Sequence, residues 1–159
     1  MSIWKSKEWK KYYLQKAYIK GIKINFDKDV NEDVKRAIKE IMAWLRTQYE
    51  FPKRLHIYVK KSLLVRARDG DKIPDLFFWP DSRDGKPYIK IATGDYPELL
   101  ENLGRDNALA TILFALLEEL THYFQWLNGM EFQEEKLKKQ ANRCARQIMN
   151  AYAETRDHP

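Results

Sequence analysis

The residues with the clearest chemical potential lie in the apolar stretch from Ala108 to Leu127. Glutamate and histidine side chains bind metal ions and transfer protons, and this stretch holds both. At about 100° per residue in a helix, four of its polar side chains fall on one narrow stripe. They are Thr111, Glu118, His122 and Gln125. A helix that is otherwise apolar almost all round is buried, so the stripe either touches solvent as an ordinary polar face or lines a cleft.

A short motif on this stretch favours the cleft. Glu118-Glu-Leu-Thr-His122 resembles the zinc-binding HExxH signature of zincin metallopeptidases, with a glutamate in place of the first histidine. The likeness is to small bacterial and phage members of the gluzincin type, and it covers roughly residues 50–159. It implies a zincin-like fold, with Glu119 as the general base for a metal-bound water and His122 as the second zinc ligand. Glu118 stands at the position of the first ligand.

The third ligand of gluzincins is a glutamate on the next helix, in a Glu-x-x-Ala pattern. Aligning Ala141 with that alanine puts Lys138 at the ligand position, which is a second departure from the motif. Glu134 and Glu135 lie one turn earlier and could replace it, unless residues 131–139 are simply a solvated helix start. The candidate ligand set is Glu118, His122 and Glu135. Two carboxylates and one imidazole would tolerate zinc but also another divalent ion such as manganese.

The two departures could also be one event. Glu118 for histidine and Lys138 for glutamate would exchange a metal site for a complementary charge pair. In this hypothesis the Lys138 ammonium lies near the vacated zinc position and pairs with Glu118. The pair would preserve the helix geometry without metal, because an unpaired buried charge is costly.

Residues 1–23 carry seven lysines and one glutamate, so this segment accounts for the whole formal net charge of +6. Aromatic residues lie between the lysines: Trp4, Trp9, Tyr12, Tyr13 and Tyr18. One interpretation is a basic aromatic arm that binds nucleic acid or an acidic partner. The other, which we favour, is a first helix or strand that packs its aromatic side chains on the core and solvates its lysines.

The chain of 159 residues predicts one domain, residues 1–159. Its single cysteine, Cys144, excludes a disulfide framework and a Cys-rich zinc site, and it fits the reducing cytoplasm. No segment is apolar for long enough to span a bilayer, and the N-terminus has no secretory signal pattern.

The elements that must position the motif follow from periodicity and turn residues. We expect helices at residues 31–49, 97–103, 107–128 with Asn107 as its cap, and 132–153. We expect strands at 55–59, 62–66 and 88–92, and an edge strand or ordered loop at 73–80. The order predicts an α+β fold, with a small twisted sheet formed by residues 55–92.

The expected function is that of a metallopeptidase-like protein with a degenerate zinc site and weak or absent peptide hydrolysis. Its substrate would be a peptide or protein strand added along a sheet edge. The alternative is a non-catalytic interaction module that binds nucleic acid or an acidic partner through residues 1–23. Metal content separates the two.

Overall fold

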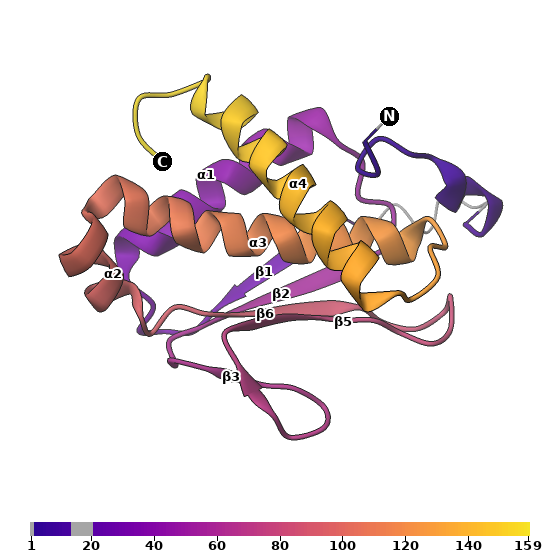
Figure 1. The fold of residues 1–159 in the computed structure, drawn as a ribbon, viewed down its shortest axis with the longest axis horizontal. Coiled ribbons are helices and arrows are strands. Elements are labelled where there is room, and N and C mark those ends of the chain that lie inside the picture. The colour runs from indigo at the N-terminus through magenta and orange to yellow at the C-terminus, as the bar shows by residue number, and fades with distance from the viewer. Residues whose placement is uncertain (1, 14–20) are drawn as a thin grey trace.

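The computed structural model describes residues 2–13 and 21–159. Its helices are the short 3₁₀ helix η1 (Glu8–Lys11), α1 (Glu32–Gln48), α2 (Tyr96–Leu103), α3 (Arg105–Leu127) and α4 (Glu134–Ala153). Its strands are β1 (Ile22–Phe26), β2 (Leu55–Lys60), β3 (Val65–Arg66), β4 (Lys72–Ile73), β5 (Asp75–Phe78) and β6 (Tyr88–Ala92). The α helices lie on one side of a four-stranded sheet (Figure 1). The predicted α+β fold is confirmed.

The sheet has the strand order β1-β2-β6-β5. Strands β1, β2 and β6 run parallel, and β5 pairs antiparallel with β6 at the edge. Successive side chains of a strand point to opposite faces, which is why the alternate residues Leu55, Ile57 and Val59 are buried under the helices. The antiparallel edge strand agrees with the edge position expected for residues 73–80.

Strand β1 corrects the predicted extent of the sheet. The sheet begins at Ile22, within the segment counted as the basic N-terminal region, rather than at residue 55. Ile22 pairs in parallel register with Leu55. Parallel strands meet only through a crossover connection, so this pairing depends on α1 lying between them in sequence.

Two predicted boundaries were also wrong. Of residues 62–66 only β3 is a strand, because the Ser62 hydroxyl donates to the Leu64 carbonyl and bends the chain there. The long helix α3 begins at Arg105, directly after Gly104, whose φ of 81° separates it from α2. Asn107 is therefore inside the helix, and its side-chain amide donates to the Leu103 carbonyl instead of capping the helix.

The N-terminal aromatic residues pack on the core, as the favoured interpretation requires. Trp4, Trp9 and Tyr13 are buried. The Trp4 indole donates to the Thr121 hydroxyl over 2.9 Å, and its ring centroid lies 4.7 Å from that of Phe124. Tyr12, by contrast, is 46% exposed. Lys16, Tyr18 and Lys20 of the basic segment lie outside the described residues.

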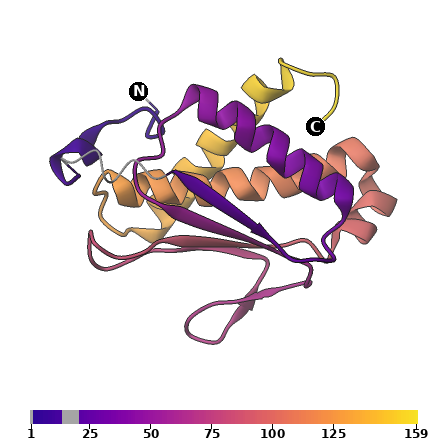
Figure 2. The ribbon, with the colours of Figure 1, turned by 180° about the vertical axis from the view of Figure 1, so that it is seen from behind.

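Helix α3 is the centre of the molecule. It crosses the sheet, with α1 against one flank and α4 against the other (Figures 1 and 2). These neighbours explain why nearly every face of the helix is apolar, from Ala108 to Leu127. In the described part of the chain no helix is both long and apolar enough to cross a membrane.

Candidate active site

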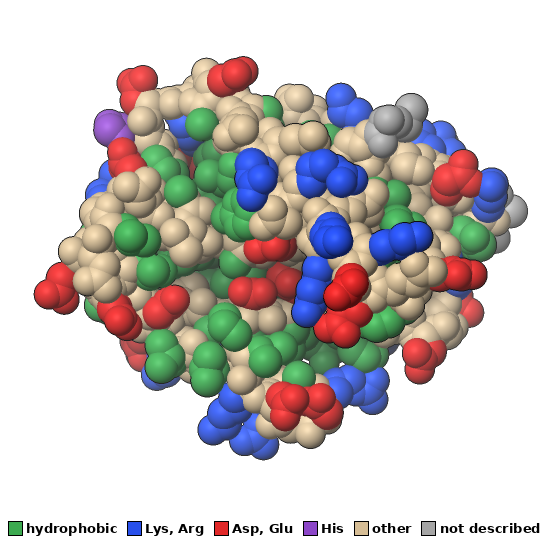
Figure 3. All heavy atoms as spheres, viewed as in Figure 1, with side chains coloured by type: hydrophobic (Ala, Val, Ile, Leu, Met, Phe, Trp, Pro, Cys, Tyr) green, Lys and Arg blue, Asp and Glu red, His purple; other side chains and the backbone are tan. Residues whose placement is uncertain are grey.

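A cleft of about 1130 Å³ opens between α3, the first turns of α4, the edge strand β5 and the β3–β4 hairpin. The space-filling view shows the surface hollowed over this region, with acidic side chains in the hollow (Figure 3). Its polar residues include Asp75, Glu118, Glu119, His122, Glu134, Lys138 and Asn142. Its aromatic residues are Phe77, Phe78, Trp79, Tyr88 and Phe132. Of the polar stripe of α3, Glu118 and His122 thus line a cleft, whereas Thr111 is exposed to solvent and Gln125 is buried.

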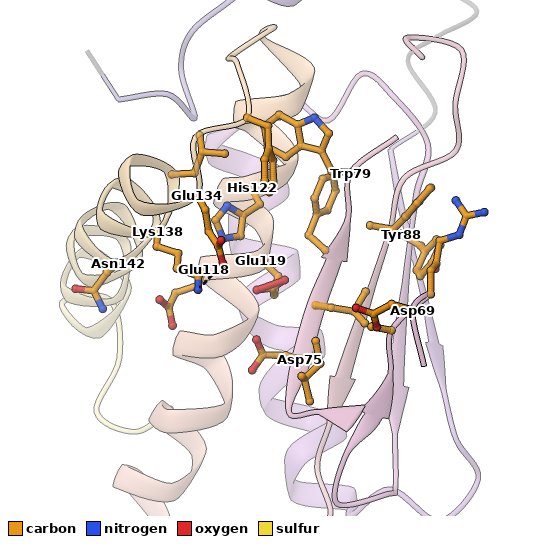
Figure 4. Close-up of a pocket in the computed structure, with 18 of the residues that line it drawn as sticks. Asp69, Asp75, Trp79, Tyr88, Glu118, Glu119, His122, Glu134, Lys138 and Asn142 are labelled. Atoms are coloured by element: carbon orange, nitrogen blue, oxygen red, sulfur yellow. Dashed lines mark ion pairs between the residues drawn. The ribbon is translucent and has the colours of Figure 1, made fainter. Parts of the chain in front are cut away.

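Glu118 and His122 project from successive turns of α3, and both line the cleft (Figure 4). Asn142 on α4 hydrogen-bonds the Glu118 carboxyl group. Burial and the negative charge of Asp75 nevertheless raise the pKa of Glu118 above its ordinary value. The first-ligand position of the motif is therefore a half-buried carboxyl group with an amide partner.

Glu119, at the general-base position, forms a carboxyl pair with Asp75 of β5. The side chain of Glu119 is nearly inaccessible, with 7% of the residue exposed. Burial, the charge of Asp75 and a hydrogen bond to Asp75 raise the pKa of Glu119 well above its ordinary value. Burial also raises the pKa of Asp75, although the hydrogen bond from Glu119 opposes this shift. A protonated Glu119 that donates to an Asp75 carboxylate explains why the hydrogen bond raises the pKa of Glu119 and lowers that of Asp75.

His122 contacts the next polar residue of the stripe. Its Nδ1 atom lies 2.7 Å from Oε1 of Gln125. Burial lowers the pKa of His122, the hydrogen bond to Gln125 opposes this shift, and the positive charge of Lys138 adds to the lowering. The imidazole is therefore neutral at physiological pH.

Helix α4 places the three candidates for the third-ligand position differently. Lys138 and Glu134 line the cleft, and they form an ion pair with 3.0 Å between Nζ and Oε1. Glu135 is exposed and does not line the cleft, so the structure does not bring it together with Glu118 and His122. The expected pairing of Lys138 with Glu118 was also wrong for the part of the chain described here, because Glu134 is the ion-pair partner.

Two polar residues of the cleft, Asp75 and Asn142, contact the motif glutamates but were not predicted as site residues from the sequence. Asp75 is a lone carboxylate in the apolar segment 73–80 between two prolines, and that was the available signal. Asn142 lies one helical turn after Lys138, on the same face of α4. Nothing in its local sequence distinguishes it from a solvated side chain.

Comparison with known proteins adds no relative. No protein-family model matches the chain, and neither a curated protein nor a solved structure does.

Proposed function

We propose that this protein is a metallopeptidase-like protein that binds peptides in the α3–β5 cleft, with a degenerate zinc site and weak or absent hydrolysis. The observation that carries the proposal is the position of Lys138. It lines the same cleft as Glu118 and His122, and its charge acts on His122. This is the place that the resemblance to gluzincins assigns to the third ligand, and here it holds an ammonium group.

The donors around the cleft do not fit a firmly bound zinc ion. Helix α3 offers a single imidazole and the Glu118 carboxyl group. Helix α4 offers the Lys138 cation and the Glu134 carboxylate that is paired with it, and the predicted ligand Glu135 does not line the cleft. Among residues 2–13 and 21–159, no three His, Cys, Asp or Glu side chains are grouped to hold a metal ion. A zinc ligand must be an electron-pair donor, which a charged lysine is not.

The general-base position supports weak hydrolysis as well. A carboxyl group activates water only when it is ionised, and the pairing with Asp75 favours the protonated form of Glu119. The same hydrogen bond ties α3 to β5, so it has a structural use that does not depend on chemistry.

The edge strand supports peptide binding. β5 pairs with β6 on one side only, and an extended peptide adds to such an edge through main-chain hydrogen bonds. Side chains of β5 alternate between the helix side, with Asp75 and Phe77, and the hairpin side, with Leu76 and Phe78. All four residues line the cleft, which therefore extends around the strand. A peptide lying along β5 would meet both parts.

The test uses a fluorescein-labelled mixture of casein peptides with EDTA present, and follows binding by fluorescence anisotropy. Phe132→Ala removes a cleft residue that is 66% exposed and whose ring lies in a T-shaped arrangement with Trp79. Leu103→Ala is the matched control, since Leu103 is 45% exposed on α2 and outside the cleft. We expect Phe132→Ala to weaken binding about tenfold and Leu103→Ala to have no effect. No binding, or equal effects of the two variants, would refute peptide binding.

Hydrolysis of the same peptides and zinc content complete the test. We expect substoichiometric zinc after dialysis and a hydrolysis rate close to that of buffer. One firmly held zinc ion per chain, or hydrolysis that EDTA abolishes, would show an active metallopeptidase instead. A cytoplasmic location is part of the proposal, because the only cysteine is a free, buried thiol.

The alternative function, nucleic-acid binding through residues 1–23, has less support. Bases stack on exposed aromatic rings, and Trp4, Trp9 and Tyr13 are buried in the core. What the described part of this segment offers to a polyanion is the half-exposed ring of Tyr12 and the charge of its exposed lysines, Lys5, Lys7, Lys10, Lys11 and Lys23. Lys11 pairs with Glu8 and Lys7 with Glu50, which reduces that charge.

A further inference from the structure

Gln125 joins the candidate site on α3 to helix α4. It is completely buried, with 0% of the residue exposed. Its amide nitrogen donates to the backbone carbonyl of Leu137 over 3.0 Å and to Oε1 of Gln140 over 2.8 Å. Its amide oxygen lies 2.7 Å from Nδ1 of His122. All the polar atoms of this buried side chain therefore have partners.

The Leu137 carbonyl determines which way the amide points. A backbone carbonyl only accepts hydrogen bonds, so the group facing it must be the amide nitrogen of Gln125. Turning the amide over would set two oxygens against each other inside the protein, where their repulsion is costly. The Gln125 oxygen consequently faces His122, and an oxygen of this kind only accepts. Nδ1 of His122 must be the donor.

We infer that Gln125 is a positioning residue: it holds neutral His122 in the tautomer that carries its proton on Nδ1. The lone pair is then on Nε2, which has no hydrogen-bond partner among the described residues. His122 lines the cleft, so it offers an acceptor to a bound molecule, such as a main-chain N–H of a peptide. The inference rests on the proposed function in one respect, namely that ligands enter this cleft.

The network also explains how α4 controls a residue of α3. Leu137 and Gln140 belong to α4, whereas His122 and Gln125 belong to α3. The position of α4 orients the amide, and the amide in turn orients the imidazole. An outer hydrogen-bond partner that sets the ring orientation and tautomer of a histidine is common at binding and metal sites.

The tautomer is measured by nitrogen NMR of the ¹⁵N-labelled, peptide-free protein at about pH 8, above the ordinary histidine pKa of about 6.5. We expect a protonated-type resonance for Nδ1 of His122 and an unprotonated-type resonance for Nε2. In Gln125→Leu, which has no acceptor, we expect loss of the protonated Nδ1 signal. Gln125→Glu should rescue it, because either form of the carboxyl group still accepts from Nδ1.

Gln140→Leu is the matched control. It removes one partner of the Gln125 amide but leaves the Leu137 carbonyl, so the Nδ1–H tautomer should persist. A wild-type protein with its proton on Nε2 would overturn the inference, and this measurement needs no variant to fold. A folded Gln125→Leu protein with an unchanged Nδ1 signal would overturn it too. Since no peptide is present, failure of casein binding leaves the tautomer result standing, and the reverse also holds.

Discussion

The buried carboxyl group of Glu119 on α3 is paired with the carboxyl group of Asp75 on the edge strand β5, and burial raises the pKa of both groups. These residues are 44 positions apart in the sequence, and their contact joins the central helix to the sheet edge at the cleft. Because both groups are buried, the pair is stable only when it holds a proton. Stability and pH are therefore linked here.

Asp75→Asn should make the free energy of unfolding less dependent on pH. A raised folded-state pKa stabilises the protein fully below the unfolded value of about 4.3, and this stabilisation is lost as pH rises through the folded value. Removing the charge of Asp75 lowers the pKa of Glu119, so less stability is lost. At about pH 8 we expect the variant to be more stable by about 1 kcal/mol. Urea unfolding at several pH values measures this.

The control for that series is Asp71→Asn, which removes an exposed aspartate of the β3–β4 hairpin. It should follow the wild-type curve. If the free energy of unfolding of wild type and of Asp75→Asn changed with pH in parallel, the carboxyl pair would not contribute to the pH dependence of stability.

The double change Glu118→His with Lys138→Glu should create a tight zinc site. Two imidazoles one turn apart on α3 can converge on one ion, and a carboxylate at position 138 faces the same cleft. Glu118→His alone leaves the lysine charge beside the metal, and Lys138→Glu alone gathers carboxylates around one histidine. We expect the double variant to bind zinc at least about tenfold more tightly than either single variant.

Calorimetric titration of zinc into the four proteins tests this coupling. A double variant no tighter than the parent would show that position 138 does not complete the site. Tight binding by Glu118→His alone would make Glu134 the third ligand, since Glu134 also lines the cleft.

Arg105→Ala should lower the free energy of unfolding at neutral pH but not in strong acid. The Arg105 guanidinium donates to both carboxylate oxygens of Asp33 over 2.7 and 2.8 Å. This bond, with help from Arg36, lowers the pKa of Asp33 to about 2. A lowered pKa gives stability that is present above the unfolded value and lost as pH falls through the folded one.

We expect only a small loss of stability at neutral pH, because the ion pair is partly exposed and solvent screens it. The difference from wild type should shrink as the pH falls toward 2 and disappear below it. Thermal unfolding across this range measures it, with the exposed Lys28→Ala as the matched loss of one cation. If Arg105→Ala and Lys28→Ala lost the same amount of stability, the cause would be the change in net charge and not the ion pair with Asp33.

Replacing Lys5, Lys7, Lys10 and Lys11 by glutamine should weaken binding to heparin in a salt-dependent way. Substitution is preferable to deletion of residues 1–23, because deletion would remove the buried Trp4 and the first residues of β1. The matched control changes four other exposed lysines: Lys28, Lys61, Lys72 and Lys136. Equal loss of retention in the two proteins would remove any special role of the N-terminal segment.

Local patterns determined most of the elements. Asn31 caps α1, and its side chain accepts from the backbone amides of Asp33 and Val34, as its sequence position predicts. Alternating residues from Tyr88 to Ala92 form β6 with the expected bounds. Such signals involve neighbours within a few residues, so they can be recognised without knowledge of the fold.

The polar stripe of α3 was equally visible, and the sequence by itself determined that Glu118, His122 and Gln125 share one helix face. Only the tertiary structure decided what meets that face. It pairs Asp75 with Glu119, turns Glu135 outward, brings Lys138 into the cleft and sets the Gln125 amide against Leu137. The reason is physical: these relations depend on how α4 and β5 pack against α3, and packing is the sum of many contacts between distant residues.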